Sequence, residues 1–504
     1  MKVRIDEVVI DEDIYPRTTL SRKVVEAYLE SLKAGEKFPP IIVQRLKYTD
    51  ENGDEEVKTV LIDGLHRVEA YKLFNEWLKR EKRQRKLVED EEYEKILNLQ
   101  PFEEVECEYW KDEVLEKEEW LTQLQLESAR LNARHGFRLT YEDMKRQARK
   151  ICEKNPDITS KEIASAFGVS PRTVREWVND IKARQKAERE AIVYRLNLLG
   201  WTQEEMAEAI GRAQQRVSQI LQEMADLPKL VKSFLDRGES IKDVAEKLGI
   251  DIQLAWAIAL EGLSDLERLR KLDNEVKGLN CKPRPYDVWN FPESHELFGY
   301  DYEGRIPGQL ILQLLYFYTK QGDLVVDPMA GSGTVIDACL LMNRKCLAYD
   351  INPKCAEKRV DIRVADAIEA IRGLKRKANL IFIDPPYFKK KEKEYGKLSI
   401  SSLSRTEYLD YFSRLARECI KKLAPDGRVA LLMSDYTEED PCESIFIHHY
   451  IERFEREGFI VERIIQCPLS TQQLHPDFQI KFTERRKLGR LARYLVIFRA
   501  SRPK

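Results

Sequence analysis

The sequence is short of the features that mark secreted, membrane-spanning and metal-binding proteins. Its nine cysteines are scattered and include no CxxC pair, which argues against a disulfide framework and against a zinc site. No apolar run reaches the ~18 residues that a membrane-spanning helix needs, and the opening MKVRIDEVVIDED has no apolar signal-peptide core. We therefore expect an intracellular, cytoplasmic protein with reduced thiols, no metal site and no membrane partner.

Net charge is nearly absent as well, although charged residues are abundant. The chain has 85 basic and 87 acidic residues, which gives a net charge of −2. Local patches can differ strongly from that mean, so the balance neither predicts nor excludes a nucleic-acid partner. A length of 504 residues exceeds what one ordinary core supports, and several domains are expected.

Three regions differ in pattern, and we expect each to form a domain. Residues 1–137 mix short strands with charged helices and predict an α+β domain. Residues 138–280 are helical throughout, with glycines at short turns, and predict an all-α region. Residues 281–504 open with an irregular stretch rich in proline and aromatics and then alternate strands with helices, which predicts an α/β domain with a mostly parallel sheet. The strands predicted in this last region are LVVD, CLAYD, DIRVAD, LIFID, RVALLM, FIVERII and YLVIFRA.

A glycine-rich turn follows the first of these strands. The run DPMAGSGT ends a buried strand at Asp327 and leads into a helix from about Thr334. Its glycines let the backbone approach a ligand lying across the carboxyl end of the sheet. The third glycine of a dinucleotide fingerprint is missing, which disfavours pyrophosphate binding. The turn residues predicted to bind a cofactor are Asp327, Pro328, Ala330, Gly331, Ser332, Gly333 and Thr334.

Two further carboxylates end the next two strands. Asp350 comes about twenty residues after the glycine turn, where an acidic side chain can accept from both ribose hydroxyls. Asp366 ends the following strand and is placed to accept from an adenine amino group. Either aspartate alone is more simply a cap at the end of a strand. Together, beside the glycine turn, they predict a nucleoside site.

The run DPPY, Asp384–Tyr387, follows a further buried strand. Pro385 and Pro386 stiffen the turn, so the Pro385 carbonyl has a fixed direction. That carbonyl and the Asp384 carboxylate could accept both protons of an exocyclic base amine and free its lone pair for attack on a methyl group. Tyr387 offers a flat face for a base flipped out of a duplex. A rigid proline turn with no catalytic role is the structural alternative.

These motifs together resemble the DNA amino-methyltransferases over about residues 284–502. The resemblance implies a Rossmann-like seven-stranded sheet with the last strand antiparallel. It also implies S-adenosylmethionine as cofactor, with Phe298–Gly308 holding its methionine end. The aspartate in DPPY favours adenine N6 over cytosine N4. The chain departs from the family in lacking a clear target-recognition insert, and only KKKEKEYGKLSISSLSR and KFTERRKLGRLAR are candidates for holding DNA phosphates.

Two helix-turn-helix patterns lie in the helical region, and a third unit differs from them. In the first, Ser170 is the predicted N-cap and Pro171 the first helical residue. In the second, Thr202 and Glu205 can form a capping box. The third unit contains the apolar helix LAWAIAL, which we interpret as core or as a dimer contact. A plain helical hairpin is the alternative for the first two. The predicted DNA-binding residues are Arg172, Thr173 and Arg175 in the first, and Gln214, Gln215, Arg216 and Ser218 in the second.

The N-terminal region resembles the ParB-like domain of chromosome-partition proteins. The pieces that match are PPIIVQRL, IDGLHRVEAYK and NARHGFRLTYED. The resemblance implies a nucleotide bound through its phosphates, since a turn of free N–H groups beside cations suits an anion. The DGLHR box is less basic than that of the partition proteins, which leaves nucleotide identity and hydrolysis open. The implied nucleotide-binding residues are Asp63, Gly64, His66 and Arg67, with Arg134 and His135 in a second box.

The sequence thus predicts a site-specific DNA adenine-N6 methyltransferase that acts on double-stranded DNA by base flipping. One alternative is a ParB-like DNA-binding, partition or regulatory protein with an accessory methylase domain. Another is a cytosine-N4 or RNA base methyltransferase. The recognition sequence, a homodimer, a partner endonuclease and a role in restriction–modification, phage defence or replication marking are left open.

Overall fold

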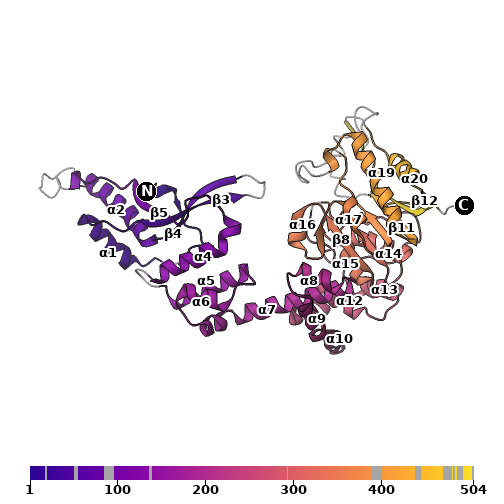
Figure 1. Cartoon of the computed structure of the whole chain (residues 1–504), viewed down its shortest axis with the longest axis horizontal. Coiled ribbons are helices and arrows are strands. Elements are labelled where there is room, and N and C mark those ends of the chain that lie inside the picture. The colour runs from indigo at the N-terminus through magenta and orange to yellow at the C-terminus, as the bar shows by residue number, and fades with distance from the viewer. Residues whose placement is uncertain are drawn as a thin grey trace. The chain divides into compact units, whose positions relative to one another are not determined.

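The computed structural model divides the chain into two compact units, Met1–Lys186 and Ala187–Lys504 (Figure 1). Each unit is described by itself. The structure describes residues 1–17, 20–49, 55–84, 96–134, 139–291, 293–302, 304–388, 400–437, 444–468, 480, 483–484 and 492–501.

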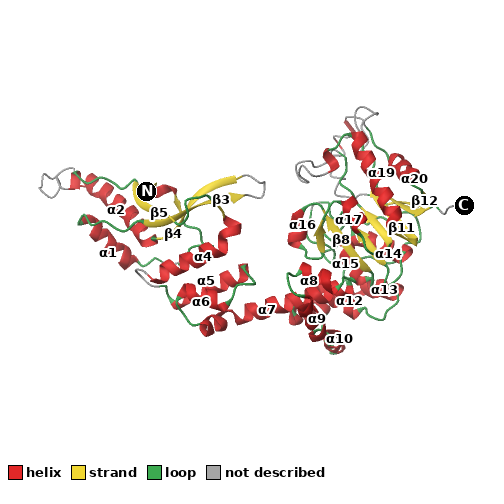
Figure 2. Ribbon diagram, viewed as in Figure 1, coloured by secondary structure: helices red, strands yellow, loops and turns green. Residues whose placement is uncertain are grey.

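The first unit begins with a mixed sheet in the order β1-β5-β3-β4-β2, with β6 also paired to β3 (Figure 2). The long β3 and β4 are antiparallel, whereas β3 and β5 are parallel. Short strands and helices alternate here, as predicted for an α+β domain. The strands are β1 (Lys2–Arg4), β2 (Val8–Val9), β3 (Ile41–Thr49), β4 (Glu55–Asp63), β5 (Glu104–Tyr109) and β6 (Leu115–Glu116), and the helices are α1 (Arg22–Lys33), α2 (Leu65–Gln84) and α4 (Lys117–Arg134).

Helices α5 (Tyr141–Lys154), α6 (Ser160–Phe167) and α7 (Pro171–Leu198) follow the sheet. Gly168 ends α6 in the left-handed conformation, with φ +68°, which a residue with a Cβ adopts only at a cost. The Ser170 hydroxyl accepts from the Thr173 N–H at 3.1 Å, as predicted for the start of α7. Helix, glycine turn and helix are therefore present, and DNA binding by them stays a prediction.

The second unit contains a seven-stranded sheet in the order β12-β13-β11-β10-β7-β8-β9. All neighbours from β11 to β9 are parallel, and β13 is antiparallel to both β11 and β12. The seven predicted strands and the antiparallel last strand are confirmed. The strands are β7 (Leu324–Asp327), β8 (Lys345–Asp350), β9 (Ile362–Val364), β10 (Ala378–Ile383), β11 (Leu423–Met433), β12 (Phe459–Gln466) and β13 (Tyr494–Ala500).

Helices cover both faces of this sheet in two groups (Figure 1). On one side α14 packs on α15 and α15 on α12, and on the other α17 packs on α19 and α19 on α20. The helices of this unit after α7 are α8 (Gln203–Ala209), α9 (Gln214–Glu223), α10 (Leu227–Asp236), α11 (Ile241–Leu248), α12 (Ile252–Ala259), α13 (Asp265–Glu275), α14 (Gly308–Tyr318), α15 (Thr334–Leu341), α16 (Pro353–Lys358), α17 (Ala367–Gly373), α19 (Arg405–Lys422) and α20 (Ile447–Arg456).

The helices before residue 280 share one core with the sheet that follows them. Leu254 and Trp256, from the apolar helix LAWAIAL, are buried in the same cluster as the sheet residues, so the core interpretation of that helix is confirmed. The Trp201 indole N–H donates to the Cys346 carbonyl on β8 at 3.1 Å. The units therefore divide the chain inside α7 and not at the predicted boundaries 137/138 and 280/281, because burial joins these helices to the sheet.

Candidate active site

The glycine turn lies between β7 and α15, at the carboxyl end of the sheet. Gly331 and Gly333 have φ of +49° and +82°, so both need the left-handed region that glycine adopts without strain. A Cβ at Gly333 would stand 2.7 Å from Nη1 of Arg359. A Cβ at Gly331 would stand 3.3 Å from the ring of Tyr302, so both glycines pack closely against side chains.

The segment Phe298–Gly308 lies against this turn, next to the place predicted for the methionine end of a cofactor. The Tyr300 N–H donates to the Ser332 carbonyl at 3.3 Å, and the Tyr300 hydroxyl donates to the Gly331 carbonyl at 3.3 Å. The Gly299 N–H donates to Oδ2 of Asp337 at 2.6 Å. Asp337 was not predicted from the sequence, because it lies within the otherwise apolar helix α15 and belongs to no motif.

Three of the four strand-end aspartates accept hydrogen bonds from backbone N–H groups. Asp327, which is buried, accepts from the Met329 N–H at 3.1 Å. Asp350 accepts from the Gly331 N–H at 2.8 Å and from the Asn352 N–H at 2.9 Å. Burial raises the pKa of Asp350, and these two hydrogen bonds oppose that rise. Asp350 thus fastens the glycine turn to the end of β8.

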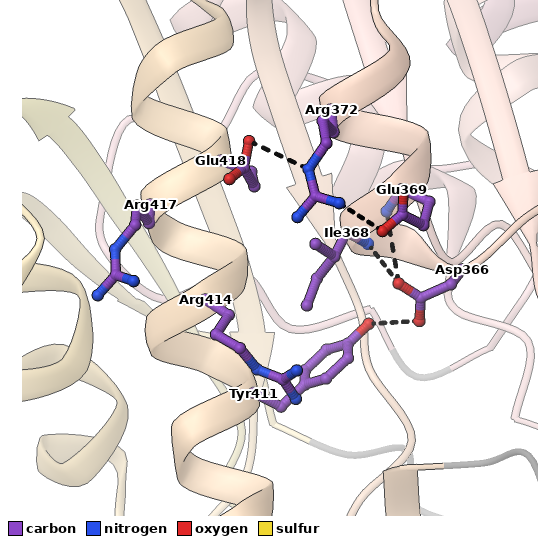
Figure 3. A pocket seen from close by; sticks show the side chains of 8 residues that line it. All are labelled: Asp366, Ile368, Glu369, Arg372, Tyr411, Arg414, Arg417 and Glu418. Carbon is purple, nitrogen blue, oxygen red and sulfur yellow. Dashed lines mark hydrogen bonds and ion pairs between the residues drawn. The ribbon is translucent and has the colours of Figure 1, made fainter.

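Asp366 caps α17 and faces a cavity (Figure 3). Its Oδ1 accepts from the Ile368 N–H at 2.9 Å, and its Oδ2 accepts from the Tyr411 hydroxyl at 3.2 Å. Tyr411 comes from the distant α19, so no local sequence signal could have found it. Oδ1 also accepts from the Glu369 N–H at 3.4 Å, and each carboxylate oxygen has about two lone-pair positions, so Oδ2 is the oxygen that can accept a further hydrogen bond. The cavity is lined by Asp366, Ile368, Glu369, Arg372, Tyr411, Arg414, Arg417 and Glu418.

A buried network of ion pairs lies next to the glycine turn. Arg359 donates to both oxygens of Asp337, at 2.9 Å each, and to both oxygens of Asp361, at 2.9 and 2.8 Å. Arg195, near the end of α7, donates to Asp337 at 2.5 Å and to Asp361 at 3.0 Å. Burial acts to raise the pKa of Asp361, but the guanidinium groups of Arg359 and Arg195 outweigh it and hold that pKa below its usual range. These residues position the turn.

The DPPY turn follows β10, next to the carboxyl ends of β7 and β11. Asp384 is half-buried, and among the described residues none donates a hydrogen bond to its carboxylate. The Tyr408 hydroxyl donates to the Pro386 carbonyl at 3.0 Å. Within the same described part of the chain, nothing donates to the Pro385 carbonyl. Among the described residues, these two acceptors of the turn are thus unoccupied, in contrast to the three aspartates above.

Burial also shapes the electrostatics of this turn. Burial raises the pKa of Asp384 to about 6, and the positive charge of Arg493 opposes the rise. Burial and the Asp384 charge raise the pKa of Tyr387, while Arg493 and hydrogen bonds with the side chains of Ser434 and Arg493 oppose that rise. Neither Ser434 nor Arg493 was singled out individually from the sequence, since Ser434 follows β11 and Arg493 precedes β13.

The residues of the ParB-like box are engaged in contacts within the first unit. Arg67 donates to Oδ2 of Asp63 at 2.7 Å and to the carbonyls of Pro39 and Pro40. Gly64, with φ +110°, opens α2, and a Cβ there would stand 2.8 Å from Ile41. These contacts explain Arg67 and Gly64 without a ligand, so nucleotide binding stays a prediction.

The other three residues of the ParB-like boxes are His66, Arg134 and His135. His66 accepts at Nε2 from the Ser21 N–H at 3.2 Å, and burial followed by the Arg17 charge lowers its pKa. Arg134 is the last residue of α4; its side chain and His135 lie outside the described residues.

The predicted DNA-binding residues differ in solvent exposure and in their ion pairs. Arg172 and Arg175 are exposed at the start of α7, where Arg172 pairs with Glu176 at 3.2 Å, and Thr173 is half-buried beside them. Arg216 pairs with Glu190 and Glu223, at 3.4 and 3.0 Å. The other three residues are on α9, Gln214 and Gln215 exposed and Ser218 half-buried. Of the two predicted phosphate-binding stretches, 389–399 and most of 481–493 lie outside the described residues.

No three His, Cys, Asp or Glu side chains of the described ranges are grouped so as to hold a metal ion. No helix of the described residues has the length and apolar character to cross a membrane.

The strand order, the antiparallel β13 and the glycine turn after β7 define a Rossmann-like methyltransferase fold. The chain belongs to the DNA methylase family, whose N6/N4 methyltransferase model matches residues 227–360 and 378–504, more than half of the chain. The match starts at Leu227, in agreement with the shared core of the helices and the sheet.

Individual relatives are more distant. The type II methyltransferase M.MjaII of Methanocaldococcus jannaschii is 26% identical over 216 residues, which are 42% of this chain and 33% of the relative. This chain thus matches about a third of the length of that curated relative. Among solved structures, TrmN of Thermus thermophilus is 18% identical over 39% of this chain and 50% of its own, with a TM-score of 0.26. A precorrin-6y C5,15-methyltransferase of Geobacter metallireducens is 15% identical over 42% of this chain and 98% of its own, also at 0.26.

Proposed function

We propose that the protein is an S-adenosylmethionine-dependent methyltransferase that modifies the N6 amino group of adenine in double-stranded DNA. Family membership supports methylation of an exocyclic amine in DNA. The observation that carries the proposal is the pair of acceptors at DPPY, the Asp384 carboxylate and the Pro385 carbonyl, which no described residue occupies. An amine has two protons to donate and needs two such acceptors.

The chemistry follows from the position of these acceptors. The amine is a poor nucleophile because its lone pair is delocalised into the ring. Two hydrogen bonds to Asp384 and Pro385 favour a pyramidal nitrogen and direct the lone pair toward the electrophile. When bound, S-adenosylmethionine supplies a methyl group on a sulfonium. As the N–C bond forms and the S–C bond breaks, one N–H proton is released, and the Asp384 carboxylate is the group placed to receive it.

A base within a duplex cannot reach this pocket. The target nucleotide must leave the stack, and Tyr387 is the flat side chain at the turn against which it would lie. The aspartate in DPPY favours adenine over cytosine as the flipped base.

The residues of the cofactor site fit S-adenosylmethionine. The glycine turn with its two left-handed residues follows β7, and Asp350 and Asp366 end neighbouring strands β8 and β9. Asp350 would accept from the ribose hydroxyls, Asp366 from the adenine amino group, and the segment from Phe298 onward would hold the methionine end.

Replacing Asp350 by alanine should weaken S-adenosylmethionine binding by about 10–100-fold, because a charged acceptor contributes about 1.5–3 kcal/mol through its hydrogen bonds. Isothermal titration calorimetry measures this directly. Asp410→Ala is the matched control, since Asp410 is an exposed carboxylate on α19 that pairs with Arg453 at 3.2 Å. Equal affinity of both variants and the wild type would contradict the assigned role of Asp350.

The target base and substrate are tested together by expression in a host that lacks adenine methylation, followed by sequencing of modified bases. N6-methyladenine at a defined motif supports the proposal. N4-methylcytosine would reassign the target, and radiolabel transfer to tRNA but not to DNA would favour an RNA base methyltransferase. No transfer to either would favour a ParB-like binding protein with an accessory methylase domain.

Helix α7 is the proposed DNA-reading element of the first unit. Arg172→Ala should weaken DNA binding at all sequences and reduce the slope of log affinity against log salt by about 1, as expected for loss of one phosphate contact. Fluorescence anisotropy at several salt concentrations gives both quantities. Arg270→Ala, which removes an exposed arginine on α13, is the control. An unchanged salt slope in Arg172→Ala would leave the helical hairpin without a DNA-binding role.

A further inference from the structure

Tyr411 lies on α19, 45 residues after Asp366, and contacts it at one end of the cavity (Figure 3). The Tyr411 hydroxyl donates to Oδ2 of Asp366 at 3.2 Å. An ionised carboxylate can only accept, and burial together with the Asp366 charge raises the pKa of Tyr411, so the phenol keeps the proton that it donates. This hydrogen bond joins the start of α17 to α19.

Contacts on two sides fix the position of the Tyr411 ring. The side chain is buried, and its ring meets that of Phe412 edge to face, with 6.0 Å between the centroids. The guanidinium carbon of Arg414 lies 5.7 Å from the centroid of the Tyr411 ring, a distance at which a cation is attracted to an aromatic face. The hydroxyl therefore has a defined place beside Asp366.

Hydrogen bonds from described residues use about three of the four lone-pair positions of the Asp366 carboxylate. The N–H groups of Ile368 and Glu369 both donate to Oδ1, and Tyr411 donates to Oδ2. Within this part of the chain, one position is left on Oδ2. The partner that fills it must be a hydrogen-bond donor.

The other two carboxylates of the cavity have a cationic partner, whereas Asp366 does not. Arg372 pairs with Glu369 at 2.6 Å and with Glu418 at 3.8 Å. Over the described ranges, no Lys or Arg side chain pairs with Asp366. Asp366 is thus the carboxylate of this cavity that is suited to a neutral donor such as an amino group.

We propose that Tyr411 is a positioning residue that gives the cofactor site its preference for adenine, by holding Oδ2 of Asp366 so that its remaining lone pair accepts from the 6-amino group. This inference rests on the proposed function and says how that site selects its cofactor. An acceptor that is fixed before the ligand arrives costs less ordering on binding than a mobile one. A purine without the amino group leaves the acceptor without a partner.

The test measures two ligands by isothermal titration calorimetry with the full chain. They are S-adenosylhomocysteine and its 6-deamino analogue, in which hydrogen replaces the amino group. The wild type should bind S-adenosylhomocysteine at least about 10-fold more tightly than the analogue, as expected for a hydrogen bond to a charged acceptor. Tyr411→Phe keeps the ring and removes the hydroxyl. It should lose about 3–10-fold in affinity for S-adenosylhomocysteine and less than about twofold for the analogue.

Tyr316→Phe is the matched control. Tyr316 is half-buried on α14, and no described residue forms a hydrogen bond with its hydroxyl. Both affinities of this variant should equal those of the wild type. Equal losses for the two ligands in Tyr411→Phe would show a structural role alone and overturn the proposal, as would a wild type that binds both ligands equally.

A double-mutant cycle gives a second check. In an Asp366→Ala background, Tyr411→Phe should change the affinity for S-adenosylhomocysteine by less than about twofold, because the group that Tyr411 positions is gone. A further loss as large as that in the wild-type background would overturn the inference. These measurements do not depend on methyl transfer. If the wild type methylates no DNA but Tyr411→Phe still narrows the preference for S-adenosylhomocysteine, the proposed function fails and the role of Tyr411 stands.

Discussion

Replacing Asp384 by alanine should lower kcat for methyl transfer by about 10²–10³-fold, the loss that follows removal of one preorganised hydrogen-bonding group from an active site. The variant loses one of the two acceptors for the amine and the base that receives its proton. S-adenosylmethionine affinity should stay within about twofold, because the residues proposed to bind the cofactor, Asp327, Asp350 and Asp366, lie at the ends of other strands. Single-turnover assays with radiolabelled cofactor give kcat separately from binding.

Two companion variants sharpen this result. Tyr387→Ala should also abolish most of the transfer, with a larger rise in KM for DNA than Asp384→Ala shows, since the ring stacks on the flipped base. Asp410→Ala should transfer methyl groups at the wild-type rate. A fall of less than about fivefold in Asp384→Ala, with normal folding, would mean that the carboxylate is not the essential acceptor.

Replacing Arg195 by methionine should lower the free energy of unfolding of the C-terminal unit by about 3–5 kcal/mol, the cost of leaving buried charges without a partner. Arg195 contacts Asp337, Asp361 and Asp251, and the first two of these are almost fully buried. Arg359 alone would then face both carboxylates. A fall in melting temperature of about 5–15 °C is expected in thermal denaturation.

The loss should extend to cofactor binding, because Asp337 and Arg359 hold the glycine turn and Gly299. Arg270→Met, at an exposed arginine of the same unit, should change stability by less than about 0.5 kcal/mol. A melting temperature for Arg195→Met equal to that of Arg270→Met would show that Arg359 suffices and that the end of α7 does not support the turn.

The elements that could be predicted were those set by residues close together in the chain. All seven strands of the C-terminal sheet follow from short apolar runs, and the Thr202–Glu205 capping box and the Ser170 cap follow from spacings of three residues. The domain boundaries could not be placed in the same way. Helices pack on a sheet through surfaces to which distant segments contribute. This packing places helices α8–α13 in the same core as the methylase sheet.

The same distinction between local and long-range features applies to the candidate site. DPMAGSGT and DPPY are each an unbroken run of residues, so their turns and acceptor groups could be predicted from the local sequence alone. Which aspartate is available to a substrate was not, because that depends on what donates to each oxygen. The Tyr411 hydroxyl on α19 donates a hydrogen bond to Asp366. Arg195 donates one to Asp361, which lies 166 residues further along the chain.

Local periodicity and short motifs were enough to predict the strand-and-helix alternation, the glycine turn, the DPPY turn and membership of a methylase family. The three-dimensional structure was needed to show that no described residue donates to Asp384 or to the Pro385 carbonyl, whereas the other strand-end aspartates accept from backbone N–H groups. It was also needed to show that Arg493 is buried. Burial and long-range hydrogen bonds fix how each group is charged and occupied, and both arise only when distant segments meet.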